Sequence, residues 1–304
     1  MSHTTNLPPA KYATSDLPTD LPEGTVAYDI TNQKMVAFKQ GAWGDLGGAA
    51  GIGSTTYVRE NVAGVIDQIQ GDIPESWKSS DTSLKGLVIG TSCTSIGSQA
   101  IRNCSGLTGN LVIPDSVTTI GESAFNNCSG LTGALTIPNN VTVINNNTFQ
   151  SCGFNGTLTI PNSVTTIGVQ AFEECGFNGA LIIPNSVTRI GDHAFFLCTG
   201  FTGTLTIPDS VTIIESSAFS TCSGLTKAIV PSSVAIMGSG VFGFCTNMIT
   251  IDCYVTKSTF DDGNSTLFNS GVTTIHVRST DTTWTAGAGQ TIGGKAGITV
   301  IKDL

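Results

Sequence analysis

The sequence has few charged side chains and even fewer cations. Asp, Glu, Lys and Arg make up 12% of its 304 residues, which is about half of the ~25% usual in globular proteins. Thirteen Lys and Arg against 22 Asp and Glu give a net charge of −9. Phosphate binding needs clustered cations, so this balance excludes nucleic acid as the expected partner.

Long apolar runs are also absent. No run approaches the roughly 18 apolar residues that would cross a bilayer, so we expect no membrane insertion. The segment from Met1 to Asn6 lacks the basic-then-apolar layout of a secretory signal, and export by that route is not expected.

Catalytic and metal-binding patterns are equally scarce. Only three histidines occur, His3, His193 and His276, and none belongs to a Ser-His-Asp or paired-carboxylate pattern. Most cysteines are 23 or 24 residues apart, whereas zinc sites use pairs about two to four apart. The sequence therefore predicts no enzyme, no cofactor and no metal site.

What the sequence does contain is a regular internal repeat. Copies such as LVIPDSVTTIGESAFNNC, from residue 111, and LTIPNSVTTIGVQAFEEC, from residue 158, recur six times. The shared prolines step by 23 or 24 residues: Pro114, Pro138, Pro161, Pro184, Pro208 and Pro231. The cysteines keep the same step: Cys104, Cys128, Cys152, Cys175, Cys198, Cys222 and Cys245.

Each copy predicts one coil of a stack. Leu158 and Ile160 alternate with a polar residue as in a strand, and Pro161 ends the pairing. Gly168 suggests a tight corner, and the spacing that follows around Phe172 suggests a short helical segment. One coil cannot bury these side chains on both sides, so stacked coils should form continuous ladders. One such column is expected to hold Phe125, Phe149, Phe172, Phe195, Phe219 and Phe242.

The string IPxSVTxIGxxAFxxC resembles the BspA-type leucine-rich repeat family over residues 87–277. This resemblance implies a mainly β leucine-rich-repeat solenoid with 23–24-residue rungs. We assign the solenoid to residues 84–304. Residues 246–304 are expected to be its C-terminal cap, in which Trp284, Ile298, Val300 and Ile301 cover the open end.

The nine cysteines allow two interpretations. Stacked cysteines on neighbouring strands, ~5 Å apart, are within reach of a disulfide. The column nevertheless lies beside the phenylalanine column, where a free thiol behaves as a small buried hydrophobe. We predict reduced, structural thiols.

Residues 1–53 differ in composition from the repeats. The segment EGTVAYDITNQKMVAFKQGAWGDLGG, residues 23–48, alternates like strands, with turns at 31–33 and 40–41. It resembles modules of bacteriophage tail fibres, and a generic hairpin is the alternative. We interpret residues 1–53 as an arm and β-hairpin unit for attachment and trimerisation.

Residues 54–83 are predicted to form a helical linker or stalk. Val58, Val62, Val65, Ile69 and Ile73 step by three or four residues, as in the narrow apolar seam of a coiled coil. Homotrimerisation would bury this seam, and packing against the first rung is the alternative.

Departures within repeat columns give the candidate binding residues. One rung alone places a cation before its second ladder isoleucine, and neighbouring positions are apolar where other rungs are polar. A patch of this kind suits a contact surface, and local repacking of a drifting repeat is the alternative. The candidate receptor-binding residues are Arg189, Asp192, His193, Phe196, Leu197, Glu173, Glu174 and Phe244.

These observations favour a non-enzymatic adhesion protein. The first prediction is a tail-fibre component of a phage virion, bound to other tail proteins through its N-terminal part. Its solenoid would recognise a glycan or protein of the host cell surface. The alternative is a BspA-type adhesin on the surface of a bacterium or protist that binds host matrix proteins.

Overall fold

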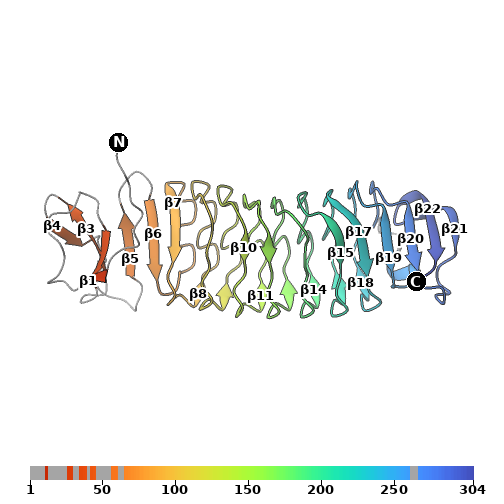
Figure 1. The fold of residues 1–304 in the computed structure, drawn as a ribbon, viewed down its shortest axis with the longest axis horizontal. Helices are drawn as coiled ribbons and strands as arrows, with labels where there is room; N and C mark the ends of the chain where they lie inside the picture. Colours follow the sequence, from red (N-terminus) through yellow and green to blue (C-terminus); the bar gives the residue numbers. More distant parts are fainter. Residues whose placement is uncertain are drawn as a thin grey trace.

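The computed structural model describes residues 71–260 and 266–304 in full, and before them the strand backbones at 11–12, 26–29, 34–39, 42–45, 56–60 and 65–70. The first four strands form one sheet in chain order (Figure 1). They are β1 (Lys11–Tyr12), β2 (Val26–Asp29), β3 (Lys34–Lys39) and β4 (Ala42–Asp45). The antiparallel pairs β2–β3 and β3–β4 confirm the predicted hairpin unit. The predicted arm precedes these hairpin strands, and apart from β1 it lies outside the described residues.

The helix predicted after this unit is wrong. The chain instead forms β5 (Thr56–Glu60) and β6 (Val65–Gln70), which pair antiparallel. The segment is rich in β-branched residues, which favour strands, and Gly64 disfavours a helix. Strand β6 pairs in parallel with β7 (Leu84–Ile89), the first strand of the repeat array. Backbone groups of the neighbouring strands therefore satisfy the hydrogen bonds of this segment. This pairing decides its conformation, although the spacing of its apolar residues matches a helix.

The repeats stack as predicted, each coil against the next, into one elongated solenoid (Figure 1). Short strands line up in parallel along one side, with Thr166 opposite Arg189 and Ile167 opposite Ile190. These strands are β8 (Ser95–Ile96), β9 (Thr119–Ile120), β11 (Val143–Ile144), β13 (Thr166–Ile167), β14 (Arg189–Ile190), β16 (Ile213–Ile214) and β18 (Ile236–Met237).

A second row of strands follows another side of the coils. The pair β10 (Leu135–Thr136) and β12 (Leu158–Thr159) precedes a sheet of order β15-β17-β19-β20-β22-β21. Its strands are β15 (Gly203–Thr206), β17 (Leu225–Val230), β19 (Thr250–Cys253), β20 (Thr274–Val277), β21 (Gly287–Ile292) and β22 (Lys295–Lys302). One short helix, α1 (Lys257–Phe260), interrupts the described strands.

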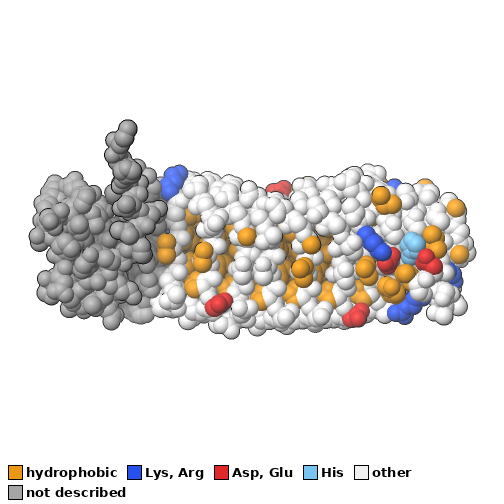
Figure 2. All heavy atoms as spheres, in the orientation of Figure 1, with side chains coloured by type: hydrophobic (Ala, Val, Ile, Leu, Met, Phe, Trp, Pro, Cys, Tyr) orange, Lys and Arg blue, Asp and Glu red, His pale blue; other side chains and the backbone are white. Residues whose placement is uncertain are grey.

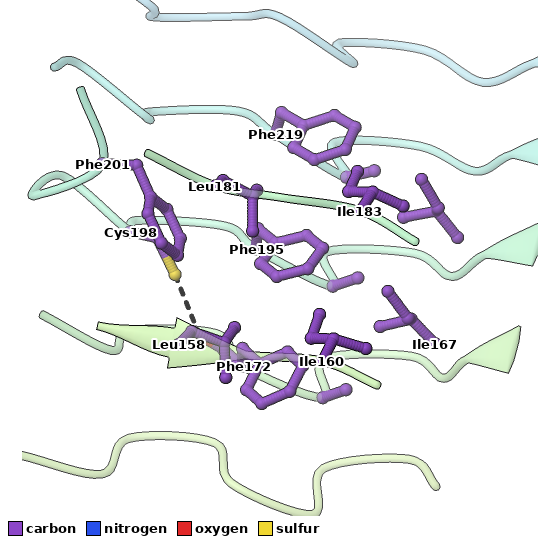
Figure 3. Close-up of a cluster of buried hydrophobic side chains, with 14 of the residues drawn as sticks. Leu158, Ile160, Ile167, Phe172, Leu181, Ile183, Phe195, Cys198, Phe201 and Phe219 are labelled. Atoms are coloured by element: carbon purple, nitrogen blue, oxygen red, sulfur yellow. Dashed lines mark hydrogen bonds between the residues drawn. The ribbon is translucent and has the colours of Figure 1, made fainter. Parts of the chain in front are cut away.

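The phenylalanine column forms a single stack in the core (Figure 3). Phe172 lies 5.7 Å from Phe149 and 5.4 Å from Phe195 between ring centroids, with nearly parallel planes. The six predicted rings are all fully buried and stacked in sequence. A second stack, Phe154, Phe177 and Phe201, meets the first edge-on. The predicted ladder is confirmed.

The segment around each of these phenylalanines is a turn, not the helical segment that its spacing suggests. Gln170 and Glu174 both have positive φ, 54° and 57°. Between them the backbone bonds across rungs, and the Phe172 amide donates to the Ala194 carbonyl at 2.9 Å. Left-handed residues placed four apart keep this segment from winding into a helix.

Glycine recurs at the Gly168 position of other rungs because neighbouring coils lie close together there, rather than because the chain turns a tight corner. A Cβ on Gly121 would lie 2.4 Å from the Ser98 amide nitrogen of the preceding rung. Gly97 and Gly238 meet the preceding backbone just as closely, whereas none of the three has a positive φ. Neighbouring coils can approach this closely only where the side chain is a hydrogen atom.

The thiols are buried and free, as predicted for reduced cysteines. Each array thiol donates to a carbonyl of an earlier rung, for example Cys175 to Phe149 at 3.1 Å and Cys198 to Phe172 at 3.0 Å. Burial raises the thiol pKa to about 11 for Cys104 and to about 12 for Cys198 and Cys245. A cysteine therefore fills a small apolar space and satisfies a carbonyl at the same position.

The C-terminal end closes the array largely as expected. Trp284 is buried, and its Nε1 donates to the Val255 carbonyl at 3.0 Å. Ile298 and Val300 are also buried, whereas Ile301 points outward and is partly exposed. The last strand in the sheet is β21, which pairs antiparallel with β22 and so differs from the parallel rungs.

Candidate functional site

The cation singled out in the sequence belongs to a polar network on the outside of the solenoid. Arg189, on β14, forms an ion pair with Glu215 of the next rung. The other carboxylate oxygen of Glu215 accepts a hydrogen bond from the Asp192 amide at 2.9 Å. The Asp192 carboxylate lies 2.9 Å from Nδ1 of His193. Glu215 takes the place of the column's glycine, so its side chain is available for this network.

Three more predicted residues, Phe196, Leu197 and Glu174, lie beside that network. The His193 ring meets the Phe196 ring edge-on, with centroids 5.0 Å apart. The Glu174 backbone amide donates to the Phe196 carbonyl at 2.8 Å, and this bond places Glu174 of the preceding rung next to Phe196. Leu197 follows Phe196, and both side chains are half-buried. We call Arg189, Asp192, His193, Phe196, Leu197 and Glu174 the polar-aromatic patch.

The other two predicted residues lie elsewhere. Glu173 is buried, and its carboxylate accepts from Gln150 at 2.7 Å and from Gln170. Glu173 stands in line with the amide side chains of Asn126 and Gln150 on the preceding rungs, and its contact with Gln150 is structural. Phe244 pairs with Phe268 at 5.5 Å between centroids, and no described contact joins it to the patch. Phe244 and Phe268 are 44% and 47% exposed.

Leu197 has a backbone conformation that its side chain disfavours. Its φ is 60°, in a column where Asn103 and Asn127 have φ of 59° and 58°. Asparagine tolerates the left-handed region, whereas other L-residues lose roughly 1–2 kcal/mol there. We expect Leu197→Asn to raise stability by about 1 kcal/mol, or about 2–4 °C in thermal midpoint. Asn127→Leu is the matched reverse change, and a rise in its midpoint would contradict the explanation.

A groove of about 320 Å³ opens where strands of the six-stranded sheet end. Pro208 and Pro231 follow β15 and β17, and both line it. Tyr254 follows β19 and Arg278 follows β20, so both occupy the proline position of their rungs. The Arg278 guanidinium lies over the Tyr254 ring, 5.1 Å from its centroid. We call this feature the corner groove.

Polar side chains from three rungs complete the corner groove. Asn185, Asp209 and Ser232 occupy the same position of successive rungs, directly after their prolines. The Arg278 guanidinium donates to the Ser232 hydroxyl at 3.4 Å. The groove therefore presents a carboxylate, an amide, a hydroxyl and a guanidinium beside proline and tyrosine rings.

Charged side chains gather toward the C-terminal end of the face seen in Figure 2. Lys227 and Asp252, on β17 and β19, form an ion pair of 2.6 Å. His276, on β20, lies 2.8 Å from the Asp303 carboxylate. The rest of the face seen in Figure 2 is mostly uncharged, with apolar side chains along its middle. Tyr254 and Arg278 of the corner groove follow the strands that carry Asp252 and His276, so the groove adjoins these charged pairs in the chain.

Sequence comparison of the columns could have found this groove. The proline column steps by 23 from Pro231 to Tyr254 and by 24 to Arg278. The motif weakens after Cys245, but the step of 23 or 24 residues continues for two more rungs and brings Tyr254 and Arg278 to the proline position.

Within residues 71–260 and 266–304, no group of three His, Cys, Asp or Glu side chains is arranged to hold a metal ion. The same described residues include no helix with the length and hydropathy to cross a bilayer.

The chain matches the family model described as "BspA type Leucine rich repeat region (6 copies)" over residues 73–198 and 179–288. Similar solved structures include a leucine-rich cell surface protein from Faecalibacterium prausnitzii, with 21% identity, 78% of this chain and 90% of that chain covered, and a TM-score of 0.40. A leucine-rich repeat protein from Bacteroides ovatus has 23% identity, coverages of 75% and 70%, and a TM-score of 0.37. The pneumococcal vaccine antigen PcpA has 19% identity, coverages of 69% and 62%, and a TM-score of 0.47. No curated protein matches the chain.

Proposed function

This chain belongs to the BspA-type leucine-rich repeat family, and on that premise we propose that it is a non-enzymatic adhesion protein of a cell surface. Its target binds to the outside of the solenoid. One observation carries the proposal: buried ladders fix the outward side chains at rung spacing, and these are mainly uncharged hydroxyl, amide and apolar groups. A rigid surface of this kind suits recognition, since little conformational freedom is lost on binding.

The test is binding of the fluorescently labelled, full-length chain to a panel of epithelial and bacterial cells. We expect saturable binding to at least one cell type. The unfolded chain at the same concentration is the control and should not saturate. Absence of saturable binding across the panel would contradict the adhesion function.

The polar-aromatic patch is the first surface to test for a protein or glycan receptor. Arg189→Ala combined with Phe196→Ser removes the ion pair with Glu215 and the ring beside His193. We expect the double variant to weaken cell binding about tenfold with the fold intact. Phe244→Ser, outside the patch, is the matched control. Unchanged binding by the double variant would move the contact to another face of the solenoid.

A tail-fibre component of a phage virion is the second candidate function. The N-terminal hairpin unit supports it, because β2, β3 and β4 occupy the segment that resembles tail-fibre modules. In this case the chain forms a homotrimer and binds other tail proteins through residues 1–53. Light scattering distinguishes the two functions: three chains per particle support the fibre, and one chain per particle supports the free adhesin.

A further inference from the structure

We propose that the corner groove binds an uncharged saccharide residue through its vicinal hydroxyl groups. This inference rests on the proposed adhesion function and names one ligand class and one site for it. The site is built from side chains of five consecutive rungs, at Asn185, Asp209, Ser232, Tyr254 and Arg278.

The charges of the groove favour a ligand without net charge. Asp209 and Arg278 both line it, yet neither forms an ion pair with any described residue. A carboxylate disfavours an anionic ligand and a guanidinium disfavours a cationic one. Hydroxyl groups both donate and accept, so a pair of them satisfies Asp209 and Arg278 at once.

Hydrogen-bonding capacity remains for such a ligand. Asp209 and Asn185 are exposed, and their side chains make no hydrogen bond in the described part of the chain. Arg278 has five N–H donors, and the contact with Ser232 uses one of them. The ring of Tyr254 under the guanidinium keeps that donor group oriented toward the groove.

The apolar part of the groove fits the carbon skeleton of a sugar. Pro208, Pro231 and Ile229 line it beside the Tyr254 ring. Its volume of about 320 Å³ is at the lower end of the roughly 300–1,000 Å³ of small-molecule sites. One sugar residue of a longer glycan fits this size better than a folded protein surface does.

The groove is a single feature, unlike the outward rows that recur in every rung. In six consecutive rungs a proline occupies the corner, and a proline offers neither a donor nor a charge. Tyr254 and Arg278 replace it only in the next two. We therefore expect one saccharide site per chain.

An array of immobilised neutral and acidic glycans tests the proposal, with soluble glucose, galactose, mannose and N-acetylglucosamine as competitors. We expect the full chain to bind neutral glycans, with competition at millimolar concentrations by at least one of these sugars. Asp209→Asn and Arg278→Gln should each weaken binding at least tenfold. Asparagine occupies the Asp209 position in three other rungs, at Asn139, Asn162 and Asn185, so this variant preserves the fold.

Arg102→Gln is the matched control, since it removes a guanidinium that lies outside both the corner groove and the polar-aromatic patch, and it should leave glycan binding unchanged. Three results would overturn the proposal: binding to acidic glycans alone, equal binding by the Asp209 and Arg278 variants, or a wild-type chain that binds cells but no glycan. The last result leaves the adhesion function standing. A wild-type chain that binds no cell contradicts the adhesion function instead.

Discussion

Raising the pH from 8 to 11 should unfold the solenoid, and the buried thiols should be the main cause. Burial raises the pKa of Cys104 to about 11, and of Cys152, Cys198, Cys245 and Cys253 to about 12, from a value of 9.0. Burial also raises the pKa of the Cys128, Cys175 and Cys222 thiols well above that value. In the folded chain these groups stay protonated at a pH where unfolded thiols ionise.

The direction of the effect follows from proton binding. Because the folded chain holds more thiol protons above pH 9, stability is complete below about pH 9 and falls as the pH rises toward 11–12. Each thiol that ionises only on unfolding removes about 1.4 kcal/mol per pH unit. For the seven array cysteines the loss is about 10 kcal/mol per pH unit, similar to the whole stability of a domain. A thiolate cannot donate a hydrogen bond to the carbonyl of the earlier rung. Ionisation of a buried thiol within the folded chain is therefore also unfavourable, and the folded state does not escape the loss in this way.

The measurement is the thermal midpoint, by circular dichroism under reducing conditions, at intervals from pH 7 to pH 11. Lysine and tyrosine also titrate in this range, so a variant is needed to assign the effect. Cys175→Ala with Cys198→Ala should reduce the slope of unfolding free energy against pH by about 3 kcal/mol per pH unit. An identical slope in the variant, or a midpoint that does not change up to pH 11, would show that the thiols are not responsible.

The sequence was sufficient for the repeating part of the fold because each position recurs. Phe125, Phe149 and Phe172 lie at equal steps, and only stacking can bury all three rings. Their column, the cysteine column and the parallel pairing all follow from that single constraint. The hairpin strands β2 and β3 were also predictable, because alternation in a short segment is a local property.

Three features that depend on particular hydrogen bonds to a neighbouring rung or strand were not predictable. The spacing of Val58, Val62 and Val65 matches a helix, yet pairing of β6 with β7 decides the outcome. The left-handed backbone of Gln170 and Glu174 exists because amides bond to the next coil. The network of Arg189 likewise depends on Glu215, 26 residues later and in a different rung.

Replacing Phe172 by alanine should destabilise the solenoid by about 3–5 kcal/mol, the usual loss for a buried phenylalanine. Its ring has stacked neighbours on both sides and meets Phe177 edge-on at 5.9 Å. Backbone hydrogen bonds hold the neighbouring coils in place, including Phe149 to Ala171 and Phe172 to Ala194 at 2.9 Å each. The coils therefore cannot collapse into the space, and the cavity remains.

The effect should be local as well as large, because each coil contacts only its neighbours. Hydrogen exchange should accelerate most in the rungs that contain Phe149, Phe172 and Phe195, and least near Trp284. This gradient matters because a long array need not unfold in one step, and a single midpoint can hide a partial loss.

Phe268→Ala is the matched control, since it removes the same ring from a position that is 47% exposed. We expect a loss below about 1 kcal/mol there, because little apolar surface returns to water. Phe172→Leu should recover more than half of the loss caused by alanine, since it refills most of the cavity. Equal losses for Phe172→Ala and Phe268→Ala would mean that the ring column does not hold the coils together. The rigid spacing of the outward side chains, on which recognition by this surface depends, would then need another source.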